Sequence, residues 1–451
     1  MNLRDQMDRG PMSPYQWGVV ALCLVLSIMD GFDVLTMAFT ANGVTKEWDL
    51  TGSQLGVLLS AGLVGMAIGS LFIAPWADRV GRRPIVLGCL VLVTIAMTTS
   101  AVSDAPWQLA ALRVLTGMGM GGLIVSITVI SGEFSSNRWR GLAVALNTTG
   151  YAFGATLGGV ITAVLQDGYG WRAVFVFGGL LSAAGLLGAL VWFPESVDFL
   201  STAAKSGAEG RLAELTRRMR LDPEQVKPLA VRRSTPNLIS GIRSLATRQY
   251  RRSAAVMCAT FFLTMFGVFF VQSWTPRLMV LAGMSESQAN LSGSLLNFGG
   301  MLGSVAIGVL AARVRLTRLL ITFEVSAAIL LCAFAATTSY LGVSLGIAVL
   351  IGAVINGAMA GLYALSTFLF GPEVRATALG TAMTVGRIGA ICSPLVTGSL
   401  VDLSWNTTSL YVVMSITFVV AAGVMCAARQ SHEDREPEVT GVPGAESLTT
   451  P

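Results

Sequence analysis

The chain has 451 residues, of which 53% are hydrophobic and only 12% are charged, and its formal net charge is +5. A soluble domain carries about 25% charged residues, so this composition excludes an ordinary soluble protein and indicates a membrane protein. The positive charge does not indicate nucleic-acid binding, because lysine and arginine concentrate in alternate loops between apolar segments.

Apolar runs of about 18 residues or more recur along the chain, and each can cross a bilayer as a helix. They lie at 17–40, 53–76, 84–103, 107–131, 141–166, 171–193, 252–276, 288–312, 317–338, 341–369, 376–400 and 409–428. Six precede and six follow one long polar segment, 194–251. We therefore predict an all-α membrane protein with twelve transmembrane helices in two six-helix halves.

The domain boundaries and the orientation follow from the same pattern. The expected parts are a leader (1–16), a first half (17–193), a linker (194–251), a second half (252–428) and a disordered tail (429–451). Within the linker, 207–220 fits a short amphipathic helix on the membrane surface. Positively charged loops stay in the cytoplasm, and arginines crowd the loops after the second, fourth and eighth spans and the linker. Both termini and the linker are thus predicted to be cytoplasmic.

Two aspartates, Asp30 and Asp33, lie inside the first span. A carboxylate at such depth costs roughly 2.5–3.5 kcal/mol on insertion scales, and residues three apart share one helix face. The face therefore lines a polar cavity, as in proton relays and substrate paths. The alternative for either residue is that it only neutralises a buried arginine.

The two halves repeat. Gly69–Val80 aligns without gaps on Gly303–Val314, and nearly the same offset places Arg140, Ala143, Thr149, Gly154 and Ala155 over Arg375, Ala378, Thr384, Gly389 and Ala390. Duplicated parallel halves are a transporter architecture, with the substrate site at their interface near mid-membrane.

Several motifs resemble the major facilitator superfamily. They are the loop Asp78-Arg-Val-Gly-Arg-Arg83 after the second span, Arg113-Val-Leu-Thr-Gly-Met-Gly119, Glu133 followed by Arg138 and Arg140, and Pro194-Glu-Ser196. Asp30-Gly-Phe-Asp33 further resembles the first-helix signature of its aromatic acid:proton symporters, the permeases for 4-hydroxybenzoate, benzoate and gentisate. Ser273-Trp-Thr-Pro276 and Gly386-Arg-Ile-Gly-Ala390 support that branch.

The chain departs from the superfamily patterns in three places. Ala74 stands where the loop signature usually has glycine, and Ala312 replaces the second-half aspartate. The glycines of the fifth span lack the proline of the exporter-type motif, which favours import.

The resemblance implies proton-coupled uptake of a small aromatic carboxylate, such as a hydroxybenzoate, by alternating access across the bacterial inner membrane. The alternatives are a symporter of another organic anion or a sugar, a proton-driven exporter, and a non-transporting membrane sensor. We expect a monomer that binds substrate, protons and lipid.

Two arginines lie inside spans, Arg113 and Arg387. Arginine keeps its proton in proteins, so each needs an anion or another acceptor beside it. Asp30 or Asp33 is the expected partner of Arg113, and the resemblance assigns Arg113 to proton coupling. The expected partner of Arg387 is the substrate carboxylate, held by a bidentate fork. The alternatives for Arg387 are backbone carbonyls or Glu324.

The remaining candidates are weaker. Polar residues that can hydrogen-bond the substrate are Asn147, Tyr151, Asn297, Asn356 and Tyr363, and rings that can stack on it are Phe32, Phe266 and Phe270. For each one, ordinary helix packing is the competing interpretation. The loop residues Asp78, Arg79, Gly81, Arg82 and Arg83 are expected to act in gating, with Glu133 paired to Arg138 or Arg140.

Enzyme chemistry finds little support in the sequence. The only histidine, His432, lies in the polar tail, which removes histidine dyads and the usual zinc sites. The six cysteines are scattered singly, and no Walker-type phosphate loop is present. We expect no enzyme activity, no metal and no cofactor.

Overall fold

The computed structural model describes residues 3–202, 208–219, 245–247, 250–338 and 340–433, and all long elements in this part of the chain are helices. The first half contains α2 (Pro14–Trp48), α3 (Gly52–Ile68), η1 (Gly69–Ile73), α4 (Ala74–Val80), α5 (Arg82–Ser100), α6 (Pro106–Glu133), α7 (Arg140–Tyr169) and α8 (Trp171–Trp192). The second half contains α12 (Arg251–Leu281), α13 (Glu286–Ala311), α14 (Leu316–Thr337), α15 (Leu341–Leu369), α16 (Pro372–Asp402) and α17 (Thr407–Glu433).

Twelve helices in the described residues are long and apolar enough to cross a membrane, which confirms the predicted number. The second of them is composite, because α3 passes through the π-helical turn η1 into α4 without a break. The short helices α1 (Leu3–Arg9) and α10 (Ala208–Arg218) lie outside this set, and α9 (Val197–Thr202) lies at the end of the sixth span, Trp171–Ser201. Helix α10 falls where the amphipathic helix was predicted.

Three of the long helices begin with the same local device. The side chains of Ser13, Thr51 and Ser285 each cap a helix. In each case the side-chain oxygen of the glutamine three residues later accepts the backbone N–H of the cap residue. This reciprocal arrangement satisfies two of the free N–H groups of a helix start. It fixes the start of α2, α3 and α13.

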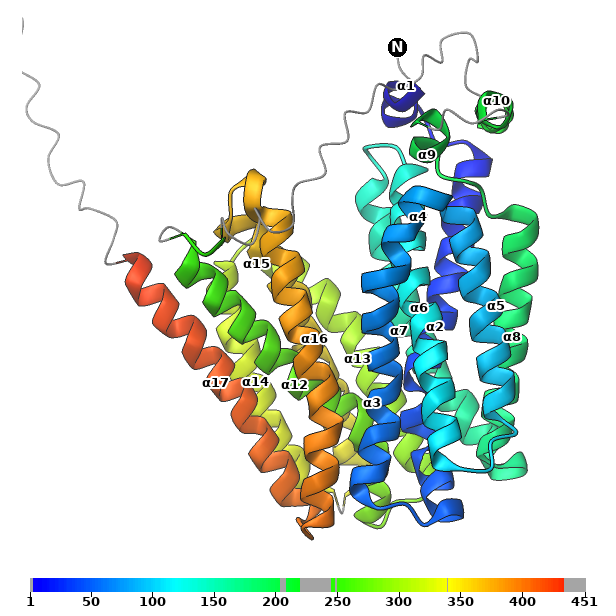
Figure 1. Ribbon diagram of the computed structural model, residues 1–451. Coiled ribbons are helices and arrows are strands. Elements are labelled where there is room, and N and C mark those ends of the chain that lie inside the picture. Colours follow the sequence, from blue (N-terminus) through cyan, green and yellow to red (C-terminus); the bar gives the residue numbers. More distant parts are fainter. Residues whose placement is uncertain (1–2, 203–207, 220–244, 248–249, 339, 434–451) are drawn as a thin grey trace, which may run out of the picture.

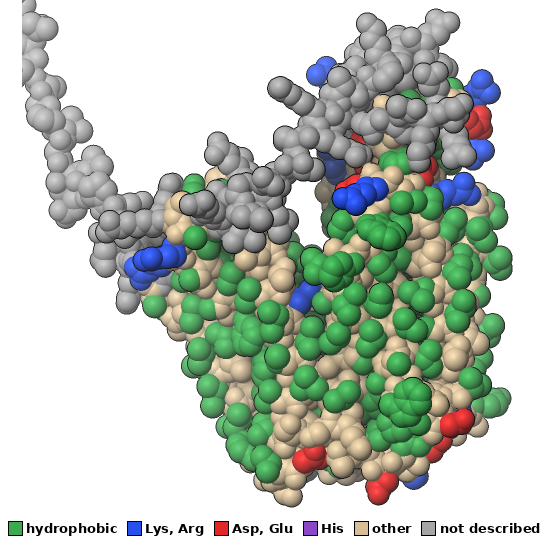
Figure 2. Space-filling model, in the orientation of Figure 1, with side chains coloured by type: hydrophobic (Ala, Val, Ile, Leu, Met, Phe, Trp, Pro, Cys, Tyr) green, Lys and Arg blue, Asp and Glu red, His purple; other side chains and the backbone are tan. Residues whose placement is uncertain are grey.

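The two halves stand side by side and diverge toward one end (Figure 1). We call the end that carries α1, α9 and α10 the linker end and the other the opposite end. Figure 2 shows the surface hollowed between the halves at the linker end. The surface elsewhere in that view is mostly hydrophobic, as expected for helices that face lipid.

The C-terminal boundary differs from the prediction. The disordered tail was expected from residue 429, whereas α17 continues to Glu433. The rest of that tail, 434–451, lies outside the described residues, as does most of the predicted linker.

Candidate functional site

A buried ion pair joins α2 and α6 in the middle of the first half. Arg113 Nη1 donates to Asp33 Oδ1 at 2.9 Å, and Nη2 donates to the backbone carbonyl of the same residue at 2.9 Å. Both side chains are almost fully buried. One of the two expected aspartates, Asp33, is therefore the partner of Arg113.

The pair sits against a seam of glycines between α3 and α6. A side chain at Gly65 would collide with the Val114 carbonyl, and one at Gly117 with the Gly62 carbonyl. Small residues at such positions let membrane helices approach closely. The seam places Gly62 of α3 directly beside the Arg113 guanidinium, and a small hollow lined by Asp33, Gly62 and Arg113, among others, remains there.

The second aspartate, Asp30, occupies a different environment. Its side chain is buried, and its Oδ1 has no hydrogen-bond partner among the described residues. Its charge interacts with that of Asp33 and, across the two halves, with that of Arg387. Asp30 thus lies within electrostatic range of Asp33 and Arg387, and we call Asp30, Asp33, Arg113 and Arg387 the central charges.

Arg387 of α16 is held by α3 rather than by a carboxylate. Its Nη1 donates to the backbone carbonyl of Met66 at 3.3 Å and to the hydroxyl of Ser70. Among the described residues no carboxylate lies within ion-pair distance of it. Of the alternatives considered, a backbone carbonyl is the one present, whereas Glu324 instead accepts a hydrogen bond from Thr264 at 2.6 Å.

Among the described residues, the hydrogen bonds that join the two halves are found between the middle of the molecule and its opposite end. Arg277 donates to Asn42 at 3.0 Å, Asn290 to Gln166 at 3.0 Å, and Ser60 to the Ile391 carbonyl at 2.8 Å. At the opposite end, Asp402 accepts bonds from Gly52 and Ser53, at the start of α3. The arrangement is closed at that end and open at the linker end.

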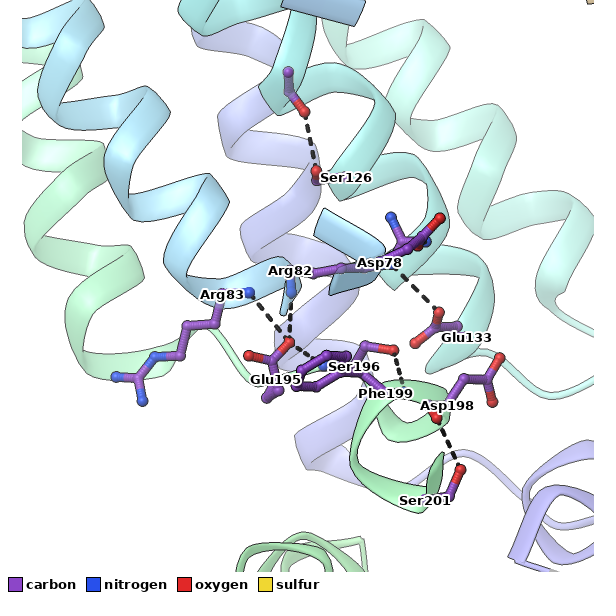
Figure 3. A network of polar contacts seen from close by, with 11 residues as sticks. Asp78, Arg82, Arg83, Ser126, Glu133, Glu195, Ser196, Asp198, Phe199 and Ser201 are labelled. Atoms are coloured by element: carbon purple, nitrogen blue, oxygen red, sulfur yellow. Dashed lines mark hydrogen bonds and ion pairs between the residues drawn. The ribbon is translucent and has the colours of Figure 1, made fainter. Parts of the chain in front are cut away.

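The loop motif at the linker end forms a network within the first half (Figure 3). Arg82 contacts Asp78 at 3.0 Å and Glu133 at 3.6 Å. Glu195 accepts the backbone N–H groups of Arg82 and Arg83 at 2.6 and 3.2 Å, which caps α5. Gly81 has a φ of 112°, which favours glycine at this turn.

One expected detail of this network was wrong. Glu133 was expected to pair with Arg138 or Arg140, but the ion pair present joins it to Arg82. Arg140 pairs with Asp8 and donates to the Gly132 carbonyl, and Arg138 lies over the Trp139 ring. Both arginines therefore have other partners than Glu133 in the described residues.

The other predicted site residues divide into two groups. Tyr151 and Tyr363 lie close enough to the central charges to interact with them, Tyr151 with Asp30 and Tyr363 with Arg387. Asn147 is buried, and neither atom of its amide has a partner in the described residues. These three remain candidates for substrate contact.

The second group is engaged in packing. Phe32 contacts Phe177 and Phe270 contacts Tyr411, both edge to face, and Phe266 lies beside Phe262. Asn297 and Asn356 each donate to a carbonyl of their own helix. Each of these five side chains therefore has a packing or helix contact of its own.

Sequence reasoning missed Ser70, the Met66 carbonyl and Asp402. A serine that bonds an arginine 317 residues away leaves no local pattern. Asp402 lay just beyond the predicted end of its span. The one available signal was its position at a helix C-terminus on the same side of the membrane as the start of the second span.

Comparison with known proteins agrees with this geometry. The family model of the Major Facilitator Superfamily matches residues 20–357 and 282–450. The gallate transporter of Pseudomonas putida is 30% identical over 98% of both chains. The 4-hydroxybenzoate transporter PcaK of the same organism is 29% identical over 96% of this chain and 97% of its own.

Solved structures share the fold at low sequence identity. A D-xylose-proton symporter covers 91% of this chain and 97% of its own with a TM-score of 0.72 at 18% identity. A bacterial homologue of the human lysosomal transporter Spinster, in an inward-facing and occupied conformation, covers 93% and 98% with a TM-score of 0.74 at 16% identity. The family model, the relatives and the twelve-helix fold together establish that this chain is a multi-pass membrane transporter of the Major Facilitator Superfamily.

Proposed function

We propose that the protein takes up a small aromatic carboxylate, such as a hydroxybenzoate, together with a proton across the bacterial inner membrane. Support for the substrate class comes from the gallate and 4-hydroxybenzoate transporters, which align with nearly the whole chain. The observation that carries the proposal is the central charge set, in which Arg387 has no carboxylate partner among the described residues.

The charges of that set favour joint transport of an anion and a proton. Asp30 and Asp33 supply two negative charges, and Arg113 and Arg387 supply two positive charges. An incoming carboxylate alone would leave one uncompensated negative charge in a site of low polarity, which is costly. One proton bound with the carboxylate restores neutrality.

Asp30 is the group that receives this proton in our proposal. Asp33 keeps its bond to Arg113, whereas Asp30 relies on the more distant Arg387. When the substrate carboxylate occupies Arg387, the repulsion between it and Asp30 is relieved by protonation. The groups that face Asp30 are Asp33, Arg387 and Tyr151.

Alternating access then rocks one half against the other around the bound acid. We assign the linker end to the cytoplasm, with both termini on that side, because positively charged segments stay there. The hollow at the linker end (Figure 2) and the bonds at the opposite end fit a carrier that faces the cytoplasm.

The test begins with binding of a panel of benzoates, phenylpropionates, nicotinate and sugars to the purified protein. We expect aromatic carboxylates to bind and sugars to fail. Uptake of labelled 4-hydroxybenzoate into cells should stop when a protonophore is added. Binding of a sugar but no carboxylate, or uptake indifferent to the protonophore, would overturn the proposal.

A further inference from the structure

The π-helical turn in the second span lies opposite Arg387. In η1 the N–H of Ala74 bonds to the Gly69 carbonyl, five residues back, instead of four. Such turns inside helices occur frequently at functional sites. Both groups that hold Arg387 come from this part of the helix, since Met66 precedes η1 and Ser70 lies within it.

The Ser70 hydroxyl is oriented by its own helix. It donates its hydrogen to the Ala67 carbonyl at 3.1 Å, so its lone pairs are available to the guanidinium. A serine hydroxyl has one donor and two acceptor positions. Ser70 therefore acts as an acceptor toward Arg387 without losing any bond of its own.

In the described structure only one nitrogen of the Arg387 guanidinium makes hydrogen bonds. Both bonds involve Nη1, and Nε and Nη2 have no partner among the described residues. Nε and Nη2 form one edge of the planar group, and two parallel N–H bonds from one edge are how arginine binds a carboxylate. Because the guanidinium is rigid and planar, the bonds at Nη1 also fix the direction of the Nε–Nη2 edge.

We propose that Ser70 is a positioning residue for substrate recognition. Together with the Met66 carbonyl it fixes one corner of Arg387 across the interface, so that the Nε–Nη2 edge is presented to the substrate carboxylate. This inference rests on the proposed function and adds to it a specific role for α3.

The same helix also touches the other central arginine. Gly62, two turns before Ser70, lies beside the Arg113 guanidinium. Helix α3 and η1 therefore contact both central arginines.

The chain offers a matched control in Ser304. The internal repeat places it over Ser70, but its hydroxyl donates to the Gly300 carbonyl of its own helix and contacts no arginine in the described structure. Ser304→Ala removes the same atom from the equivalent helix of the other half.

The experiment measures 4-hydroxybenzoate binding to the full-length protein in detergent. Ser70→Ala should weaken binding about five- to tenfold, less than the loss of a direct charged hydrogen bond to the substrate, because Arg387 keeps its charge and loses only part of its positioning. Ser70→Thr should restore it, and Ser304→Ala should leave it unchanged. In an Arg387→Ala background, Ser70→Ala should have no further effect. Unchanged or tighter binding in Ser70→Ala, or an equal loss in both backgrounds, would overturn the proposal.

A measurement without substrate separates this proposal from the proposed function. Thermal unfolding of the same four proteins (wild type, Ser70→Ala, Arg387→Ala and the double variant) should show non-additive losses, because the two residues share one bond. If the wild type binds no aromatic carboxylate, the proposed function fails, while the unfolding cycle still reports whether Ser70 holds Arg387. Additive losses would overturn the role of Ser70 by themselves.

Discussion

The carboxylate of Asp402, the last residue of α16, accepts both the backbone N–H of Ser53 at 2.8 Å and its hydroxyl at 2.5 Å. The backbone N–H of Gly52 donates to the same carboxylate at 2.5 Å. The start of α3 has a partial positive charge and free N–H groups that favour an anion. One side chain of the second half thus completes the cap of a helix in the first half.

We expect Asp402→Asn to loosen the closed end. The amide retains acceptor capacity on one atom only and carries no charge, so the α3 cap loses bonds and its favourable interaction with the helix dipole. Spin labels at Val102 and Tyr340, both exposed at the opposite end, should report a larger share of long distances. Asp104→Asn, at an exposed carboxylate of the same end, should change nothing. Identical distance distributions in all three proteins would show that Asp402 does not hold the end closed.

The Asp33–Arg113 pair should contribute to the free energy of unfolding. Asp33→Asn removes the charge that compensates a buried guanidinium, and breaking a buried pair costs about 3–5 kcal/mol. Asp33→Asn combined with Arg113→Gln should recover a substantial part of this loss, because no unpaired charge remains. Thermal unfolding measures both variants. A double variant less stable than Asp33→Asn alone would show that the pairing is not the source of the loss.

Asp33→Asn should impair transport far more than it impairs binding. The amide has the shape of the carboxylate but no charge, so the central charges can accept a substrate carboxylate without a proton, and accumulation of substrate should be abolished. Binding should remain largely intact, because the expected carboxylate contact lies at Arg387. Uptake and equilibrium binding on the same preparation test this. Loss of binding equal to the loss of uptake would place Asp33 in substrate recognition instead.

Asp30 should determine the pH dependence of binding. In our proposal a proton is bound with the substrate, so wild-type affinity rises as pH falls, over a range in which the substrate stays ionised. Asp30→Asn mimics the protonated side chain, so its affinity should not depend on pH. A pH indicator in weak buffer should show proton uptake when substrate is added to the wild type and none in the variant. Proton uptake that persists in Asp30→Asn would assign the proton to another group.

Arg387→Lys should weaken binding about ten- to hundredfold, because an ammonium group lacks the planar fork that matches a carboxylate. Methyl 4-hydroxybenzoate supplies the complementary change on the substrate. It should bind far more weakly than the acid to the wild type, but similarly to the acid in Arg387→Ala. Equal losses in both proteins would mean that Arg387 never contacts the carboxylate, and Arg113 would become the leading candidate.

Much of the fold followed from physical patterns that are local in sequence. Apolar length predicted the number of membrane-spanning helices, and the cost of burying charge directed attention to Asp33 and Arg113, which the structure joins. Contacts between helices were harder to predict, because they depend on crossing geometry. The predicted partner of Glu133 was wrong for this reason, because Arg82 reaches it from the start of α5.

The partners of Arg387 show the same limit more clearly. The sequence marks it as an arginine in need of an acceptor, but its acceptors lie in and just before a π-helical turn of the other half of the molecule. No residue type specifies such a turn, and a backbone carbonyl has no sequence signature. The aromatic residues show a related limit, because edge-to-face packing within a half and substrate stacking use the same rings.

The central claim is that one proton accompanies one carboxylate, which makes each transport event electrically neutral. Proteoliposomes that contain the purified protein permit a pH gradient and a membrane potential to be imposed separately. We predict that a pH gradient alone, alkaline inside, drives accumulation of 4-hydroxybenzoate, and that a potassium diffusion potential alone does not. Accumulation driven by the potential in the absence of a pH gradient would contradict the account.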